Sequence, residues 1–213
     1  MGKPRSPNGR ARAVHERLKS EYEAICELDH DSPFELLVAT ILSAQCTDAR
    51  VNKTTPALFN RYPSPFELAA ADQMDLEKIV HPTGFYKSKA KNLLKMANQL
   101  LDDHEGVVPK ELAELVSLGG VGRKTANVIR SVAFGLPGLP VDTHVGRLAR
   151  RLGLTEEEDP VKVEMALTPM VPQYERGEFS LRVILHGRQV CFARNPQCDN
   201  CVLNDFCPAA FDF

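Results

Sequence analysis

Two copies of the tetrapeptide Ser-Pro-Phe-Glu, at residues 32–35 and 64–67, constrain the fold of this chain most strongly. A serine followed three residues later by glutamate is a helix-capping box, and proline is favoured at the first helical position. The first copy opens the run LLVATILSAQ, which is apolar nearly all round and therefore predicts a buried helix. Further helical patterns cover residues 87–104, 143–152, 161–170 and 178–190. No segment alternates apolar and polar residues, so we predict an all-α protein of about ten helices with short loops. Residues 4–8 are expected to form a loose tail.

A glycine-rich turn lies in the middle of the chain, in LVSLGGVGRKTANVIRSVAFG at residues 115–135. A phosphate-binding P-loop reads G-x-x-x-x-G-K-[ST] and follows a strand, but here Arg123 separates Gly122 from Lys124. The preceding residues, 109–116, have apolar positions at helical spacing. The sequence therefore predicts a helix, a tight turn and a second helix. Such a turn is either a simple helix corner or a place where backbone N–H groups meet a phosphate.

The end of the chain is rich in cysteine. The pattern C-x6-C-x2-C-x5-C places four of them within seventeen residues, at Cys191, Cys198, Cys201 and Cys207. A disulfide framework would suit a small secreted protein, so this loop indicates a metal centre. Zinc sites of four cysteines usually contain two close pairs and this loop has one, so an iron–sulfur cluster suits the spacing at least as well. The spacing leaves both metals open. Cys26 and Cys46 have apolar helical surroundings, which predicts structural positions.

The net charge of −2 does not by itself indicate a nucleic-acid-binding protein, but the charges are unevenly placed. Residues 1–20 carry six Lys or Arg and one Glu, and residues 84–151 carry eleven against six Asp or Glu. A basic face on an otherwise acidic protein fits phosphate binding, although solvated helix faces would give the same pattern. The chain has no run of about 18 apolar residues and no signal peptide, so we expect a cytoplasmic, nucleoid-associated protein without membrane contact.

Several of these segments together resemble the endonuclease III family, the bifunctional DNA glycosylases of base excision repair. The resemblance rests on LGGVGRKTANV, on VDTHVGRLARRLGL at 141–154 and on the cysteine loop. The segments LLVATILSAQCTDARVNK at 36–53, GFYKSKAKN at 84–92 and ILHGRQVC at 184–191 also match. The resemblance covers about residues 20–207. It implies that the four cysteines of the loop hold a [4Fe–4S] cluster and not zinc.

The resemblance also implies a two-lobed helical fold. A six-helix barrel domain would span residues 26–136 and contain a helix-hairpin-helix at about 109–134. Residues 1–25 and 137–213 would form the iron–sulfur cluster domain, with a DNA cleft between the lobes. The expected partner is double-stranded DNA with damaged pyrimidines or abasic sites, bound by a monomer. The expected reactions are removal of an oxidised pyrimidine and cutting of the strand by β-elimination.

Catalysis is assigned by the resemblance to Lys124 and Asp142. A neutral amine can attack the sugar C1′, expel the damaged base and leave a Schiff base. A free lysine is almost wholly protonated near neutral pH, so surroundings that favour the neutral amine are needed. A helix N-terminus, the neighbouring Arg123 and partial burial would all act in that direction. Asp142 would stabilise positive charge on the sugar, and capping the helix that begins at Thr143 would orient it. A phosphate-contacting lysine and a plain helix cap are the structural alternatives.

DNA contacts are implied as well. The target base must leave the duplex, and Gln45 would fill the gap opposite the estranged base. Phe85 would wedge the base stack from the GFY loop, where the family commonly has leucine; a buried glutamine and a core phenylalanine are the alternatives. The hairpin would bind phosphate through its backbone, and a monovalent cation at its carbonyls can assist. Its residues are Leu118, Gly119, Gly120, Val121, Gly122, Arg123 and Thr125.

Other functions compete with this interpretation. Monofunctional glycosylases for adenine, or for uracil or thymine, are disfavoured by Lys124. A non-catalytic hairpin module would bind DNA without releasing a base and would need neither Lys124 nor Asp142. An iron–sulfur electron carrier would leave the hairpin without a use.

Overall fold

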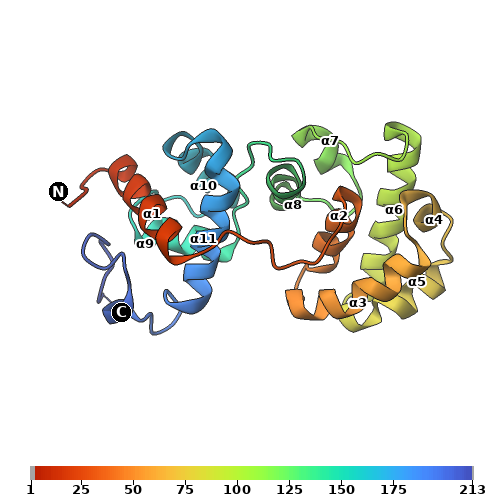
Figure 1. Ribbon diagram of the computed structural model, residues 1–213, viewed down its shortest axis with the longest axis horizontal. Coiled ribbons are helices and arrows are strands. Elements are labelled where there is room, and N and C mark those ends of the chain that lie inside the picture. Colours follow the sequence, from red (N-terminus) through yellow and green to blue (C-terminus); the bar gives the residue numbers. More distant parts are fainter. Residues whose placement is uncertain (1–2, 213) are drawn as a thin grey trace. The chain divides into compact units, whose positions relative to one another are not determined.

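The computed structural model describes residues 3–212, and within that range every regular element is a helix (Figure 1). This confirms the all-α prediction. The chain separates into two compact units. We call Cys26–Phe134 the hairpin unit and Met1–Ile25 together with Gly135–Phe213 the cysteine unit. Among the described residues, no helix is both long enough and apolar enough to cross a membrane.

The hairpin unit packs its helices around α2 and α6. Eight of the ten residues of α2 are buried, as its all-round apolar sequence predicts, and α6 lies against α2, α4 and α5. A π-helical turn, Ile129–Ala133, continues α8 without a break. The helices are α2 (Pro33–Leu42), α3 (Asp48–Arg61), α4 (Pro65–Ala69), α5 (Gln73–Val80), α6 (Tyr86–His104), α7 (Leu112–Ser117) and α8 (Arg123–Val128), with a 3-10 turn at His81–Thr83.

The two capping sequences start helices as predicted. The Ser32 hydroxyl accepts the Glu35 N–H at 3.2 Å, and the Glu35 carboxylate accepts the Asp31 N–H at 2.7 Å. Ser64 caps α4 by accepting the Phe66 N–H at 3.2 Å. In both cases proline occupies the first turn, where a missing N–H costs nothing.

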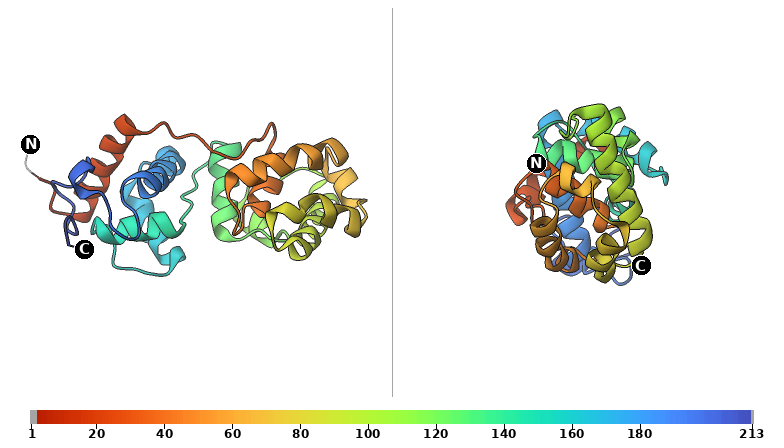
Figure 2. Two further views of the ribbon diagram at one scale, coloured as in Figure 1. Left: turned by 90° about the horizontal axis from the view of Figure 1, so that it is seen from below. Right: turned by 90° about the vertical axis from the view of Figure 1, so that its right-hand side faces the viewer.

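The cysteine unit packs α1 against helices from the later part of the chain. In Figures 1 and 2, α1 lies beside α11, and their buried faces share an apolar core that includes Leu18 and Phe179. The helices are α1 (Pro7–Glu21), α9 (Thr143–Arg151), α10 (Pro160–Leu167) and α11 (Arg176–Gln189), with 3-10 turns at Thr168–Met170, Gln173–Glu175 and Cys198–Asn200.

Two expectations about helix ends are wrong. Of the tail expected at residues 4–8, only residues 4–6 lie outside a helix, because Ser6 accepts the Gly9 N–H at 3.1 Å and Pro7 opens α1. This is the same Ser-Pro device, hidden in a segment rich in proline and glycine. The helix expected at 161–170 changes to a 3-10 turn after Leu167, since Pro169 cannot continue the α-helical hydrogen bonds.

Candidate functional site

The glycine-rich segment forms a helix, a turn and a helix, as predicted. α7 ends at Ser117 and α8 begins at Arg123. The turn between them is closed by the Val121 N–H, which donates to the Leu118 carbonyl at 3.1 Å. Gly120 has φ +77°, a left-handed conformation that favours glycine. The chain therefore reverses within five residues and brings the start of α8 to the surface.

Two of the three glycines are needed for packing against α6. A Cβ at Gly119 would lie 2.8 Å from the Asn92 carbonyl oxygen, and one at Gly120 would lie 2.9 Å from the Asn92 Cβ. A Cβ at Gly122 would meet nothing within 4 Å. Packing therefore explains Gly119 and Gly120, whereas Gly122 leaves the backbone at the start of α8 open to an approaching group.

A glutamine that the sequence did not single out holds the turn in place. The Gln99 side chain, from α6, accepts the Gly119 N–H at 2.8 Å and donates to the Ser117 carbonyl at 3.0 Å. The Ser117 carbonyl is at the end of α7, and the Gly119 N–H lies in the turn that follows. No motif marks this residue, because its partners lie about twenty positions away. Gln99 is thus a structural support of the hairpin.

The side chains of the hairpin divide into two groups. Leu118 and Val121 are buried, at 3% and 6% exposure, so any contact from these positions to DNA must use the backbone. Arg123 and Thr125 are half-buried. Lys124 is exposed, and the partial burial expected for it is wrong because it points outward from the first turn of α8. An exposed amine at this place is accessible to a large substrate.

Asp142 is the N-cap of α9, as its position before Thr143 predicted. One carboxylate oxygen accepts the Val145 N–H at 2.9 Å. The capping bond uses only one of the two oxygens and fixes the orientation of the other. The half-buried carboxylate is therefore held rigidly while one oxygen stays available to a cationic group.

Gln45 and Phe85 share an uncommon backbone conformation in the hairpin unit. Their φ angles are +53° and +48°, in the left-handed region that residues other than glycine rarely adopt. Both side chains are exposed, and Phe85 reaches 66% exposure. The alternatives of a buried glutamine and a core phenylalanine are therefore wrong. Cys26 and Cys46 pack beside the core of the unit, as expected for structural residues.

All four cysteines of the terminal loop line one cavity of the cysteine unit. Much of the remaining wall is apolar, with Leu148, Leu152 and Leu203 among its residues. A mostly apolar wall that includes four cysteines suits a group that binds through thiolates.

The four thiols suit an iron–sulfur cluster. A [4Fe–4S] cube binds each of its four cysteines to a different iron, so its ligands line the wall of a cavity, as these cysteines do.

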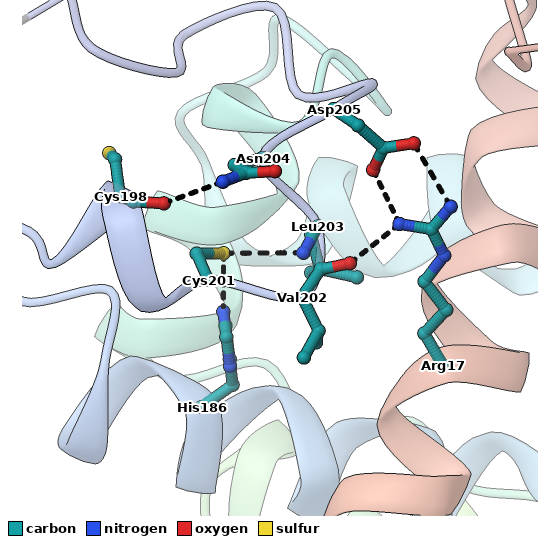
Figure 3. Close-up of polar contacts among 8 residues, drawn as sticks. All are labelled: Arg17, His186, Cys198, Cys201, Val202, Leu203, Asn204 and Asp205. Carbon is teal, nitrogen blue, oxygen red and sulfur yellow. Dashed lines mark hydrogen bonds and ion pairs between the residues drawn. The ribbon is translucent and has the colours of Figure 1, made fainter.

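His186 contacts the sulfur of Cys201 (Figure 3). Its Nε2 lies 3.3 Å from the Cys201 Sγ, and its Nδ1 lies 3.0 Å from the Tyr22 hydroxyl. Burial lowers the pKa of His186 to about 4, so the ring is neutral and carries one proton. Bound to a cluster as a thiolate, Cys201 could only accept, and the proton of the ring would then lie on Nε2. Tyr22 would in turn donate to Nδ1 and hold the ring in this tautomer.

Basic side chains fasten the backbone of the cysteine loop. Arg17 donates to the Val202 carbonyl at 2.6 Å and pairs with Asp205, and Figure 3 shows both contacts. Arg151 donates to the Phe192 carbonyl at 2.7 Å and to the Cys191 Sγ at 3.3 Å. These charge-assisted bonds fix the loop from α1 and α9.

Burial acts on the protonation of two of the four cysteines. Burial raises the pKa of the Cys201 thiol to about 11 and also raises the pKa of the Cys207 thiol. Metal ligation requires thiolates, so cluster binding must displace these protons. The positive charge of Arg151 acts in the opposite direction, because it lowers the pKa of the Cys207 thiol and so favours the thiolate.

Family models match both parts of the site. A model for the HhH-GPD superfamily base excision DNA repair proteins matches residues 38–173. A model for the iron–sulfur binding domain of endonuclease III matches residues 191–207, from the first to the fourth cysteine of the loop. Together with the hairpin and the cysteine cavity, these matches define a base excision DNA repair protein with an iron–sulfur domain.

Sequence similarity to known proteins identifies the family within this class. The chain is 49% identical over 212 residues to an endonuclease III of Synechocystis sp., covering 99% of this chain and 97% of the relative. It is 46% identical over 185 residues to that of Bacillus subtilis, with coverages of 86% and 84%. The chain belongs to the endonuclease III family, and its cofactor is a [4Fe–4S] cluster.

Solved structures agree with this assignment. A trapped endonuclease III–DNA covalent intermediate, in an estranged-adenine complex, matches with a TM-score of 0.91 at 42% identity. The match covers 95% of this chain and 96% of the other. A thermostable thymine-DNA glycosylase matches with a TM-score of 0.85 at 21% identity, which shows a shared fold.

Proposed function

We propose that this member of the endonuclease III family is a DNA glycosylase and abasic-site lyase that removes oxidised pyrimidines from duplex DNA through a Schiff base at Lys124. The observation that carries the proposal is the place of Lys124. It is exposed on the first turn of α8, directly behind a turn whose backbone is open at Gly122. A phosphate held at this turn would bring the sugar of the target nucleotide within reach of the amine.

The chemistry follows from a neutral amine beside a nucleotide. The Lys124 Nζ attacks the sugar C1′, the bond to the base breaks, and the base leaves with the electron pair and gains a proton. The nitrogen gives up a proton, the C1′–O4′ bond of the sugar ring breaks, and O4′ gains a proton, which leaves a protonated imine between Lys124 and C1′. Removal of a C2′ proton then expels the 3′ phosphate and cuts the strand. To Asp142, whose carboxylate caps α9 by accepting the Val145 N–H, we assign the stabilisation of the positive charge on the sugar.

The hairpin supplies binding that is independent of base sequence. The first N–H groups of a helix have no acceptor within the helix and attract phosphate. Because Leu118 and Val121 are buried, we assign them and Gly119, Gly120 and Gly122 backbone roles, with a monovalent cation assisting at the turn. Arg123 and Thr125 add side chains at the start of α8.

Gln45 and Phe85 are proposed to insert into the base stack after the target base has been flipped out, with Gln45 in the gap and Phe85 as the wedge. Both are exposed on left-handed turns that hold the side chain outward. Phe85 offers an aromatic face that can stack on bases, and Gln45 offers an amide that can hydrogen-bond to an unpaired base.

The cysteine unit carries the cofactor. When bound through Cys191, Cys198, Cys201 and Cys207, the cluster supplies a cross-link that fixes a loop with little regular structure of its own. The exposed Arg188 and Arg194 lie beside this loop and are proposed to contact the DNA backbone.

The partner is proposed to be duplex DNA with damaged pyrimidines or abasic sites. The support comes from relatives, since solved endonuclease III structures include a non-covalent DNA complex at 41% identity. We further propose that the protein acts as a monomer on nucleoid DNA in the cytoplasm. Sedimentation of the protein with and without a lesion-containing duplex measures the stoichiometry directly.

The test separates base release from strand cutting. A duplex with one thymine glycol is incubated with the wild type, Lys124→Ala and Asp142→Asn, and the products are resolved with and without alkaline treatment. We expect the wild type to release the base and cut the strand, and Lys124→Ala to do neither. Base release without strand cutting by the wild type would make the protein a monofunctional glycosylase.

A further inference from the structure

One lysine of the hairpin unit is buried and has no part in the mechanism described above. Lys89, near the start of α6, is 4% exposed. Its ammonium donates a 2.7 Å hydrogen bond to the Thr83 carbonyl. Burial lowers the pKa of Lys89, and the Cys46 thiol is the other group that acts on it. No carboxylate of the described residues contributes to this balance.

A lysine in such a place is costly. An ammonium loses its water on burial, and here one carbonyl replaces it without a counter-ion. An apolar chain of similar length would fill the same space at lower cost. The lysine is therefore best explained by what its hydrogen bond holds.

The Lys89 side chain ties the start of the loop that carries Phe85 to α6. Its ammonium binds the Thr83 carbonyl, directly before Gly84 and Phe85. Thr83 is itself buried and anchored, because its hydroxyl donates to the Val80 carbonyl at 2.8 Å. After Phe85 the chain is held by α6 itself, whose first hydrogen bond joins the Lys89 N–H to the Phe85 carbonyl at 3.0 Å. The side chain of Lys89 therefore fixes the end of the tip that the helix does not hold.

The tip needs this support. Gly84 has φ +70° and Phe85 has φ +48°, so two successive residues adopt left-handed conformations. A bulky side chain is disfavoured there and persists only where the surroundings determine the backbone. The Phe85 ring is 66% exposed, so packing of the ring does not hold it. The support comes from the backbone contacts beneath.

We propose that Lys89 is a positioning residue that locks the Gly84–Phe85 tip in its left-handed form, so that the Phe85 ring is presented ready for insertion into the base stack. This inference rests on the proposed role of Phe85 as the wedge. Because the Phe85 loop already has the conformation needed for insertion, no conformational entropy is lost in ordering it during base flipping. The free energy of reaching the flipped state is therefore lower. Lys89 would therefore matter most for a lesion that is still paired.

The experiment compares two duplexes in single-turnover base release. In one, thymine glycol lies opposite adenine; in the other, it lies opposite a one-nucleotide gap, where no partner base has to be separated. We expect Lys89→Met to slow release from the paired duplex on the order of 10- to 100-fold, as for a misplaced group. The same variant should act near the wild-type rate on the gapped duplex. Lys89→Arg, which keeps a donor, should recover part of the loss.

Control variants distinguish a loss of loop positioning from a loss of stability and from a loss of the Phe85 ring. Lys78→Met removes an exposed lysine of α5 and should leave both rates unchanged. Phe85→Ala should show the same dependence on the duplex, and adding Lys89→Met to it should cause no further loss. Thermal unfolding of each variant is recorded, and Lys89→Gln is measured in the same way if Lys89→Met yields no folded protein.

The outcomes are distinct. Equal slowing on both duplexes would show a general defect and overturn the positioning role, as would wild-type rates on both. Additive losses in the double variant would show that Lys89 acts apart from Phe85, which also overturns it. Wild-type rates in Phe85→Ala would show that Phe85 is not the wedge, and the positioning role of Lys89 would be overturned as well. Absence of base release by the wild-type protein on either duplex would instead contradict the proposed enzymatic function.

Discussion

The support that Gln99 gives to the hairpin yields a quantitative prediction. In Gln99→Leu, the side chain keeps a similar volume but loses both hydrogen bonds to the turn. Gly119 is buried, so its N–H would be left without a partner. An unsatisfied buried donor costs about 1–3 kcal/mol. We therefore expect the free energy of unfolding of the protein to fall by about that amount, corresponding to a decrease in Tm of about 2–4 °C for each kcal/mol.

The assay is urea unfolding followed by far-ultraviolet circular dichroism, together with the visible absorbance of the cluster. The cluster absorbance should be retained in native buffer, because Gln99 belongs to the hairpin unit and the cysteines to the other. Affinity for a duplex with an abasic-site analogue should fall as the turn loosens. Asn98→Leu is a matched control on α6, since the Asn98 amide binds only within its own helix at the Leu94 carbonyl. A Gln99→Leu protein as stable as Asn98→Leu and the wild type would refute the reasoning.

Three further predictions test other parts of the structure. Gly120→Ala should unfold at lower urea and bind DNA more weakly, because a Cβ would lie 2.9 Å from Asn92 on a backbone with φ +77°; equal urea midpoints would contradict this. The hydrogen bond to His15 lowers the pKa of Glu175 in the folded protein. This bond therefore stabilises the fold above the pKa of the unfolded glutamate, about 4.3, and the stabilisation is lost as the pH falls through the pKa of the folded state. Glu175→Gln should therefore be less stable than the wild type near pH 7 in urea titrations, with the difference shrinking below about pH 4. His186→Leu should lower the reduction potential of the cluster, measured by film voltammetry. The substitution removes an N–H donor to the Cys201 sulfur, and such a donor stabilises the reduced cluster, which carries more negative charge. An unchanged potential would contradict the donor role of His186.

Local signals in the sequence predicted those features that depend on neighbours along the chain. The Ser32 and Asp142 caps form as expected, because a cap bonds to an N–H three residues ahead. The turn between α7 and α8 and the cysteine loop were also found from their spacing. The start of α1 at Pro7 was missed because proline and glycine around it masked the Ser6 cap.

Features that depend on contacts across the fold were not predicted. Gln99 and Lys89 look like ordinary residues of an amphipathic helix, and their importance depends on which carbonyls and N–H groups come near them. The burial of Leu118 and Val121 likewise follows from packing of the turn on α6, which spacing does not reveal. The exposure of Lys124 depends on which side of α8 faces the core.

The most direct measurement of the central claim is trapping of the Schiff base. The protein is mixed with a duplex carrying one thymine glycol, borohydride is added, and covalent protein–DNA complexes are separated on a denaturing gel. Wild-type protein and Lys124→Ala are run in parallel, with Lys78→Ala as a control for loss of a lysine. The account predicts a covalent band for the wild type and Lys78→Ala that is absent in Lys124→Ala. A band of full strength in Lys124→Ala would contradict the account, because the nucleophile would then be another amine.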